Sequence, residues 1–544
     1  MNPNSPQGGE IAIGVVGSFN SLNPFILSGQ SASGIGYSFD SLMAKSKDEL
    51  SSYYPLIAKS ISIKPLESKI EFELNNFVRF HNNEKLTAKD IKFTFETLKS
   101  EGHPRYKIAF RDIKEITINN DYNISFEIKD ISNKDLISQI VLTPILSADF
   151  FDKNKFDKVS LKPILGSGPY QIEKANPGNS ITYTKSINYW GKDLPVNIGL
   201  YNFDEIKFIY YRDSNIAIRG IKAKEYDIRF ENIAKNWATQ YQNTELIQEF
   251  IPHSIPTPMQ SFVINNRLNK FSDINTRKAL NLAFNFEWTN KNLFYNSYDR
   301  TNSFFENSVF SASDEISSEE KKLYEQIELP KSEFSKFNQI EIPINSESGY
   351  NRESLIKAKN LLLSGHYQYK EQKLVDKKTN KQFEIEFLIT SPSFKRVILP
   401  YIANLNKLGI KSKIKQVDSS IYQKRLENFD FDITVSVFPT SMIPGNELYA
   451  YLHSDNKDIV GSMNLAGINN QYVDKLIEKI INIENFDDLK NYTNALDRIL
   501  LSNYYVIPHW NISGFRLVYW DKIQHPDISP DYDICLECWY KSDI

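Results

Sequence analysis

Two short motifs near the start of the chain begin like catalytic or cofactor-binding signatures, and neither is complete. Gly29-Gln30-Ser31-Ala32-Ser33 resembles the turn that presents a nucleophilic serine, but serine occupies the last position, where the motif requires glycine. Gly34-Ile35-Gly36-Tyr37-Ser38-Phe39 lacks the third glycine of a dinucleotide-binding loop. The 7 histidines are spread over the chain, and acid–base pairs cannot be inferred from spacing alone. We therefore predict no catalytic residues, no cofactor and no metal site.

The cysteine pair Cys535 and Cys538 is the remaining feature that could carry chemistry. A zinc site would need two more ligands, and the histidine nearest in sequence, His525, has no partner at metal-ligand spacing. A redox pair would be expected at a helix start after a strand, whereas this pair lies in the closing tail. We favour a structural disulfide or an idle pair.

Bulk composition limits the classes of function. The chain has 544 residues, so we expect about three domain-sized units. Its composition is 41% hydrophobic and 24% charged, without an apolar run long enough to cross a bilayer. The net charge of -3 and the scattered lysines and arginines argue against nucleic-acid binding.

Apolar periodicity predicts mixed strands and helices. Apolar and polar residues alternate at 70–74 and 124–128, as in half-buried strands. Thr87 and Asp90 have capping-box spacing before a helix, and 274–284 and 472–481 also have helical periodicity. Further strands are predicted at 383–389, 414–417 and 431–437. This order indicates an α/β fold.

A turn-rich stretch in the first half of the chain carries a family resemblance. Leu165-Gly166-Ser167-Gly168-Pro169-Tyr170 forms a stiff turn whose glycines permit close backbone approach. The aromatic segment 188–197 follows, and then segments 202–206, 226–229 and 235–241. This succession resembles the oligopeptide and microcin C (YejA-like) branch of the extracellular solute-binding proteins, family 5, which are the ligand-capturing subunits of ABC importers.

Other segments match that family in the expected order, so the resemblance covers nearly the whole chain. They are residues 2–9, 18–25, 80–83 and 86–91. Residues 277–280, 284–290 and 441–447 are similar to this branch in particular. One departure is Phe438-Pro439-Thr440, where relatives that take ordinary oligopeptides have an Asp-Tyr-Pro-Asp type motif. The terminus-binding aspartate of those relatives is therefore not transferred to this chain.

The resemblance implies a two-lobed periplasmic binding protein with an inserted subdomain and a hinged cleft. We predict lobe I at 1–40, 165–258 and 505–544, the inserted subdomain at 41–164 and lobe II at 259–504. The chain would then cross between lobes near 256–258 and 502–506. Two crossing strands would permit hinge closure over a ligand while each lobe stays rigid.

A groove that accepts different peptides must bind their main chain and their termini. An extended ligand can pair with backbone edges, and the ligand amine requires a carboxylate because an enclosed charge without a partner is costly. Glu447 is the predicted amine partner, since it follows the strand where relatives place that group; the alternative is a solvated loop carboxylate. Gly29, Gln30, Ser31 and Ala32 are predicted to offer backbone to the ligand, unless they form a plain surface turn.

The remaining predicted ligand contacts each have a structural alternative. Asn236 and Trp237 belong to lobe I, where the tryptophan could instead pack in the core. Trp288 and Asn290 lie near a helix boundary, where Asn290 could act as a cap. Asn464 follows a glycine-serine turn, and turn stabilisation is the stronger interpretation. His509 and Trp510 would line the cleft or be buried between the lobes.

The predicted function is capture of short peptides, including formylated or antibiotic-like ones, for an inner-membrane ABC permease. Met1 directly precedes Asn2-Pro3, a segment that in the family lies just inside the mature chain, so we expect an exported, periplasmic protein whose leader has been removed and replaced by a start methionine. We expect it to act as a monomer without nucleic acid. The alternatives are a receptor of this fold for an oligosaccharide, nickel chelate or haem, a peptidase, and a structural or chaperone-like surface protein.

Overall fold

The computed structural model describes residues 2–129, 133–242, 244–334, 336–337, 340–483 and 485–542. Contacts divide the chain into two compact units. Unit 1 comprises Met1–His253 and Gly514–Ile544, and unit 2 comprises Ser254–Ser513. Within the described residues, no helix is long and apolar enough to span a membrane.

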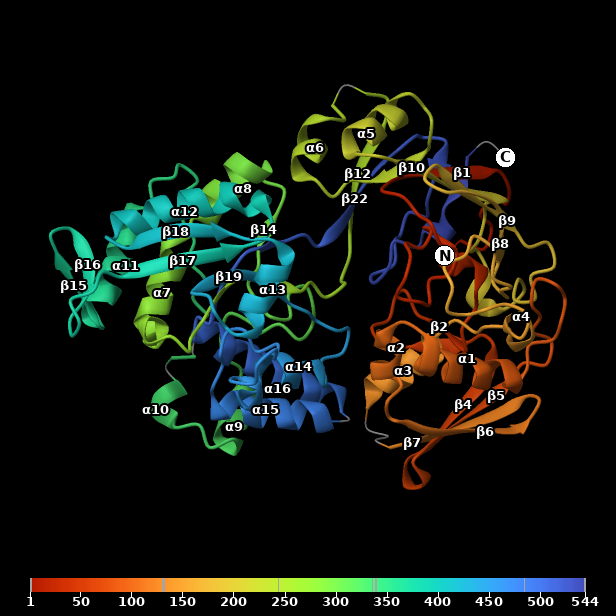
Figure 1. Ribbon diagram of the computed structural model, residues 1–544, viewed down its shortest axis with the longest axis horizontal. Coiled ribbons are helices and arrows are strands. Elements are labelled where there is room, and N and C mark those ends of the chain that lie inside the picture. The colour runs from red at the N-terminus through yellow and green to blue at the C-terminus, as the bar shows by residue number, and fades with distance from the viewer. Residues whose placement is uncertain are drawn as a thin grey trace. The chain divides into compact units, whose positions relative to one another are not determined.

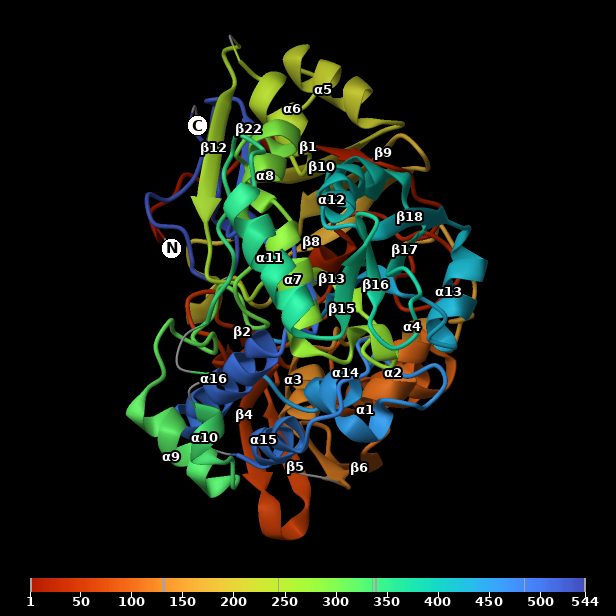
Figure 2. The same ribbon diagram turned by 90° about the vertical axis from the view of Figure 1, so that its left-hand side faces the viewer.

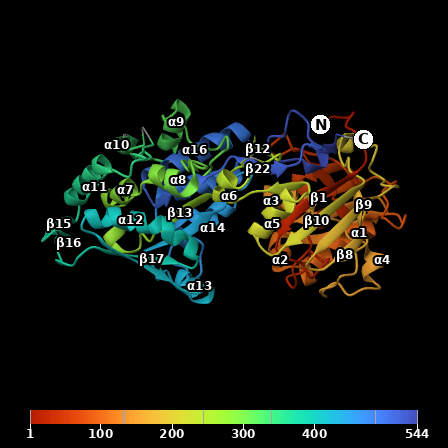
Figure 3. The same ribbon diagram turned by 90° about the horizontal axis from the view of Figure 1, so that it is seen from above.

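A seven-stranded mixed sheet organises unit 1, in the order β12-β22-β11-β1-β10-β9-β8 (Figure 1). Its strands are β1 (Glu10–Val16), β8 (Tyr170–Asn176), β9 (Ser180–Lys185), β10 (Glu205–Tyr211), β11 (Ile228–Phe230), β12 (Ile247–Pro252) and β22 (Gly514–Tyr519). β1 runs parallel to β10 and β11, and the other pairs are antiparallel. Figure 3 shows β1, β10, β9 and β8 side by side. Helices α5 (Ser214–Lys222) and α6 (Ala234–Thr239) lie in the connections around β11.

A second sheet is inserted between β1 and β8. It is antiparallel, in the order β4-β5-β7-β6, with β4 (Ala58–Lys64), β5 (Lys69–Leu74), β6 (Ile113–Asn120) and β7 (Asn123–Ile128). The predicted alternation is present, since Ile70, Phe72 and Leu74 are buried. They share a core with helix α1 (Ala88–Glu101), which begins at the predicted Thr87–Asp90 capping box. The other elements of this region are β2 (Met43–Lys45), β3 (Tyr53–Pro55), α2 (Pro104–Ala109), α3 (Lys134–Leu142) and α4 (Ala148–Phe151).

Unit 2 is built on a five-stranded sheet in the order β18-β17-β19-β13-β20. The strands are β13 (Met259–Ile264), β17 (Glu384–Ile389), β18 (Lys411–Gln416), β19 (Ile433–Phe438) and β20 (Val506–Pro508). β17 is parallel to β18 and β19, and β13 is antiparallel to β19 and β20. Phe262 of β13 packs against Phe284, Phe387 and Tyr401, so aromatic rings form the centre of this core.

Helices and two short two-stranded sheets complete unit 2. Helix α11 lies against α7 (Figure 2). The helices are α7 (Ile274–Ala283), α8 (Phe286–Phe294), α9 (Ser318–Gln326), α10 (Lys331–Phe334), α11 (Arg352–Ser364), α12 (Lys395–Lys407), α13 (Ser419–Glu427), α14 (Glu447–Leu452), α15 (Gln471–Asn482) and α16 (Phe486–Ser502). Two-stranded ladders join β14 (Asp299–Arg300) to β21 (Trp510–Asn511) and β15 (Tyr367–Lys370) to β16 (Lys373–Asp376).

The chain leaves and re-enters unit 1 through neighbouring strands. β12 and β22 are antiparallel partners, and Pro252 lies opposite Gly514. The division between units therefore falls after residues 253 and 513, whereas we expected crossings near 256–258 and 502–506. The second crossing is later because β20 pairs with β13 and keeps residues 506–508 in the sheet of unit 2.

Candidate functional site

His509 lies at the end of β20 in a ring of aromatic side chains. Its backbone N–H donates to the carbonyl of Gln260 at 2.9 Å, and its fully buried ring contacts Phe262 at 4.2 Å and stacks on Trp510 at 4.8 Å. Nδ1 lies 3.3 Å from Nε2 of Gln260. Burial holds the pKa of His509 well below its ordinary value, and nearby Arg300 lowers it further, so the imidazole is neutral.

Arg300 lies beside His509 because β14 and β21 pair. The backbone of Arg300 is opposite Trp510, and the N–H of Thr301 donates to the carbonyl of His509 at 3.2 Å. The Arg300 guanidinium is 5.2 Å from the ring centre of Phe284 and 5.6 Å from that of Phe286. Burial lowers the pKa of Arg300 to about 10, against the opposing attraction of Glu287.

The polar atoms of this cluster are incompletely paired. All three guanidinium nitrogens of Arg300 and Nε2 of His509 are buried without a hydrogen-bond partner among the residues that the structure describes. We name Arg300, His509, Trp510, Phe284 and Phe286 the Arg300 cluster. Buried polar groups are normally paired, so this cluster is a candidate binding site.

Trp510 extends the cluster toward helix α8. Its ring is half-buried and lies 4.6 Å from Phe294, whose other neighbours include the guanidinium of Arg396 at 5.4 Å. Trp288, on the same helix, lines a cavity of about 250 Å³ together with Phe284 and Tyr401. The structure thus places the neighbours His509 and Trp510 beside Arg300, and Trp288 lies on the same helix as Phe294, which contacts Trp510.

Asn290 and Asn464 use their side chains within the protein. Asn290 closes the end of α8, since Nδ2 donates to the carbonyl of Tyr298 at 2.7 Å and Oδ1 accepts the N–H of Tyr298 at 3.2 Å. Asn464 is fully buried. Its amide donates to the carbonyls of His453 and Ile468 and accepts the N–H of Ile468, over 2.9 to 3.1 Å. These bonds match the structural alternatives of a helix-end cap and a turn.

Glu447 is the first residue of α14 and interacts with its own loop. Both carboxylate oxygens accept the N–H of Gly445, at 3.2 and 3.1 Å, and one accepts the hydroxyl of Ser441. The carboxylate is half-buried. This arrangement orders the proline-glycine turn that precedes the helix.

In unit 1, residues 29–32 pair with the preceding strand-like segment. The carbonyl of Gln30 accepts the N–H groups of Asn20 and Ser21, and the N–H of Ala32 donates to Ser21 at 3.1 Å. Gly29 has φ of +86°, a conformation that favours glycine, and it is exposed together with Gln30 and Ser31. Ala32 is buried.

Asn236 and Trp237 of α6 pack inside unit 1. The Asn236 amide lies 3.2 Å from Oγ of Ser214 and 3.5 Å from Oε1 of Glu231, which is ion-paired with Arg229 at 3.3 Å. Trp237 packs against an apolar core. The structure therefore gives both residues internal contacts.

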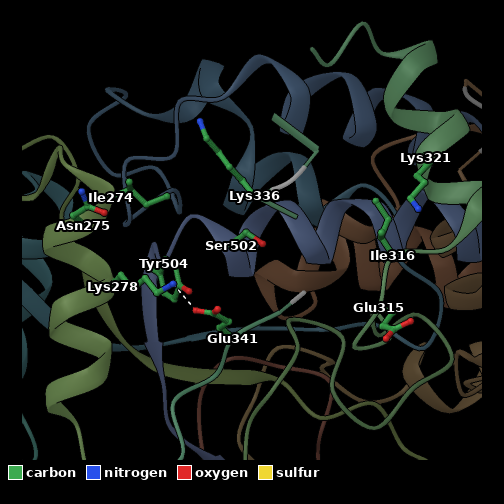
Figure 4. Close-up of a pocket in the computed structure, with 10 residues that line it drawn as sticks. All are labelled: Ile274, Asn275, Lys278, Glu315, Ile316, Lys321, Lys336, Glu341, Ser502 and Tyr504. Atoms are coloured by element: carbon green, nitrogen blue, oxygen red, sulfur yellow. Dashed lines mark hydrogen bonds and ion pairs between the residues drawn. The ribbon is translucent and has the colours of Figure 1, made fainter. Parts of the chain in front are cut away.

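A cavity of about 750 Å³ in unit 2 contains none of the predicted residues (Figure 4). Three lysines from separate segments of the chain line it, and Lys278 is ion-paired with Glu341.

Cys535 and Cys538 form a disulfide with a Cα–Cα distance of 5.3 Å. No group of three or more metal-ligating side chains occurs in the described part of the chain.

Comparison with known proteins identifies the family. The model of the bacterial extracellular solute-binding proteins, family 5 (middle region), matches residues 52–458. The chain belongs to this family. Family 5 proteins of YejA type are similar over nearly the whole chain. YejA of Escherichia coli K12 is 32% identical, over 99% of this chain and 90% of the relative, and the probable peptide-binding protein YejA of Agrobacterium fabrum is 32% identical, over 98% and 89%. The peptidoglycan-binding protein YepA of A. fabrum is 30% identical, over 100% and 92%.

Solved structures confirm the family 5 fold. NikA from Brucella suis, in complex with Fe(III)-EDTA, has a TM-score of 0.74 at 15% identity and covers 98% of this chain and 100% of NikA. AppA from Bacillus subtilis, in complex with a nonapeptide, has a TM-score of 0.65 at 18% identity, with 99% and 100% coverage. The predicted mixed α/β, two-lobed fold is therefore confirmed. The family is one of binding proteins rather than enzymes.

Arg300 is the residue that sequence reasoning missed. It lies in Tyr298-Asp299-Arg300-Thr301, which matches no motif, and nothing in the sequence distinguishes it from other arginines. Its special property is the absence of a partner in the described structure, which depends on the β14–β21 pairing across more than two hundred residues.

Proposed function

We propose that this chain is an exported receptor that captures short peptides and delivers them to an inner-membrane ABC permease. The observation that carries the proposal is the similarity to the probable peptide-binding protein YejA over 98% of the chain. A periplasmic location, action as a monomer and absence of covalent chemistry belong to the same proposal.

Within the chain, we assign ligand contacts first to His509 and Trp510 of the Arg300 cluster and to Trp288. Aromatic rings of this kind provide apolar area for differing side chains, and the neutral imidazole can hydrogen-bond to a peptide. Gly29, Gln30 and Ser31 remain proposed backbone contacts because they are exposed. Asn236, Asn290, Asn464 and Glu447 support this function indirectly, by ordering the elements around them.

The test is thermal unfolding with an equimolar mixture of tri- to pentapeptides, prepared with formylated and with unmodified amino termini. A ligand at about a hundred times its dissociation constant adds about 2.7 kcal/mol to the free energy of unfolding. We expect a rise in melting temperature with peptides and none with the same mass of amino acids.

Matched variants separate the site from general effects. Trp510→Leu should weaken peptide binding, whereas Tyr350→Leu, which changes an aromatic ring that is 84% exposed in the same unit, should not. If neither peptide mixture changes the melting temperature of the unmodified protein, the proposed function is wrong.

A further inference from the structure

Buried arginines of unit 2 provide an internal comparison for Arg300. Arg498 is fully buried and donates to Glu320 and to backbone carbonyls. Arg277 is 6% exposed and donates to the carbonyls of Asn503, Phe271 and Ser272 at 2.8 to 2.9 Å. Arg300 is buried to a similar degree, with 9% exposure, yet its nitrogens lack partners among the described residues. The chain therefore satisfies these two buried guanidinium groups by itself, whereas the described residues offer that of Arg300 no hydrogen-bond acceptor.

Nearby acidic and hydroxyl groups do not pair with Arg300. Glu287 attracts Arg300 electrostatically, but the hydrogen bond that the structure gives its carboxylate comes from the N–H of Asn345 at 2.9 Å. The hydroxyl of Tyr401 donates to the carbonyl of Leu280 at 2.9 Å. An anionic group would supply both the charge and the acceptor oxygens that the guanidinium requires.

His509 adds a second donor to the same cluster. In the observed orientation of the Gln260 amide, Nε2 of Gln260 donates to Nδ1 of His509 at 3.3 Å. The neutral imidazole then carries its proton on Nε2, which has no partner in the described structure. Both His509 and Arg300 lie against the ring of Phe284. Two donor groups without acceptors, both next to the ring of Phe284, are suited to bind a carboxylate, whose oxygens accept hydrogen bonds and donate none.

We propose that the Arg300 cluster receives a carboxylate of the ligand, with the guanidinium of Arg300 as the principal partner and Nε2 of His509 as the second. This inference rests on the proposed function and deepens it, because it requires the peptide to present a carboxylate at this place in unit 2. The C-terminal carboxylate is present in every unmodified peptide, whatever its side chains. The cluster therefore selects free-acid peptides over their C-terminal amides.

The test compares two equimolar mixtures of tri- to pentapeptides without acidic side chains, one as free acids and one as C-terminal amides. Isothermal calorimetry on the full chain should give at least about tenfold tighter binding of the free acids, since a hydrogen bond to a charged group is lost with the amide. Arg300→Met should bind both mixtures weakly and equally. Arg352→Met, which removes an exposed positive charge from the same unit, should retain the preference.

The outcomes separate this inference from the proposed function. Equal binding of both mixtures to the unmodified protein, or an Arg300→Met variant that still prefers free acids, would overturn the carboxylate assignment and leave peptide binding intact. Failure of the unmodified protein to bind either mixture would overturn both proposals. Circular dichroism of Arg300→Met checks that the variant is folded, and Arg300→Lys, which keeps the charge, should retain part of the preference.

Discussion

Replacing Arg300 by methionine should stabilise the ligand-free protein. The pKa of Arg300 falls below its ordinary value, to about 10, because burial disfavours the charged form. Below pH 10 the group is protonated in both the folded and the unfolded chain, so the full cost of burying the charge, about 3 kcal/mol, applies at neutral pH. Methionine has a similar length and leaves no charge to be compensated.

Two contacts oppose this gain. The guanidinium lies over Phe284 and Phe286, and loss of these two cation–π contacts together costs about 2 kcal/mol. The net expectation for Arg300→Met is a gain of about 1 kcal/mol in the free energy of unfolding, or about 3 °C in melting temperature. Arg277→Met should have the opposite sign, because it removes three hydrogen bonds to backbone carbonyls and leaves those carbonyls unpaired.

The assay is differential scanning calorimetry at pH 7 on protein that has been unfolded and refolded to release any bound ligand. The unmodified protein, Arg300→Met and Arg277→Met are compared under the same conditions. A melting temperature for Arg300→Met that falls as far as that of Arg277→Met would refute the reasoning, because it would show that Arg300 holds the fold together.

Three further predictions concern stability. Burial raises the pKa of Asp40 to about 8, so stability is lost as the pH rises from about 4 to 8 and the buried carboxyl ionises. Asp40→Asn should therefore add about 4 kcal/mol to the free energy of unfolding at pH 7 and little at pH 4. Equal effects of the variant at both pH values in urea unfolding would contradict this. Because the pKa of His509 is depressed in the folded protein, the free energy of unfolding falls as the pH drops below 6.5. His509→Phe should reduce this loss of stability in acid. An unchanged pH dependence in the variant would show that His509 takes up a proton freely in the folded protein. Asn464→Ala removes three buried hydrogen bonds and should lower the free energy of unfolding by about 2 to 4 kcal/mol, as measured in urea. A decrease below about 0.5 kcal/mol would exclude the turn-stabilising role.

Local elements could be predicted because their signals are local. The burial of Ile70, Phe72 and Leu74 follows from the alternation of apolar and charged residues, and the start of α1 follows from the spacing of Thr87 and Asp90. The boundary after residue 513 could not be predicted in this way. Val506–Pro508 is apolar throughout, and the sequence does not say which of the two sheets it joins.

The candidate site was predicted in part, for a related reason. His509 and Trp510 were chosen as aromatic and titratable residues near a crossing, and the structure places them against Arg300. Arg300 itself could not be found, since its guanidinium is distinguished by the lack of hydrogen-bond acceptors among the described residues and not by a pattern of residue types. Asn290 is a polar residue near a predicted helix boundary and Asn464 one after a predicted turn, but their bonding to Tyr298 and to Ile468 is visible only in three dimensions.

Mass spectrometry of the molecules that copurify with the protein tests the central claim most directly. The protein is purified without added ligand, its intact mass is measured under native conditions, and the bound fraction is released by denaturation and sequenced. The account predicts a mixture of short peptides with free carboxyl termini. Release of a single non-peptide ligand, such as a sugar or a metal chelate, at full occupancy would contradict it.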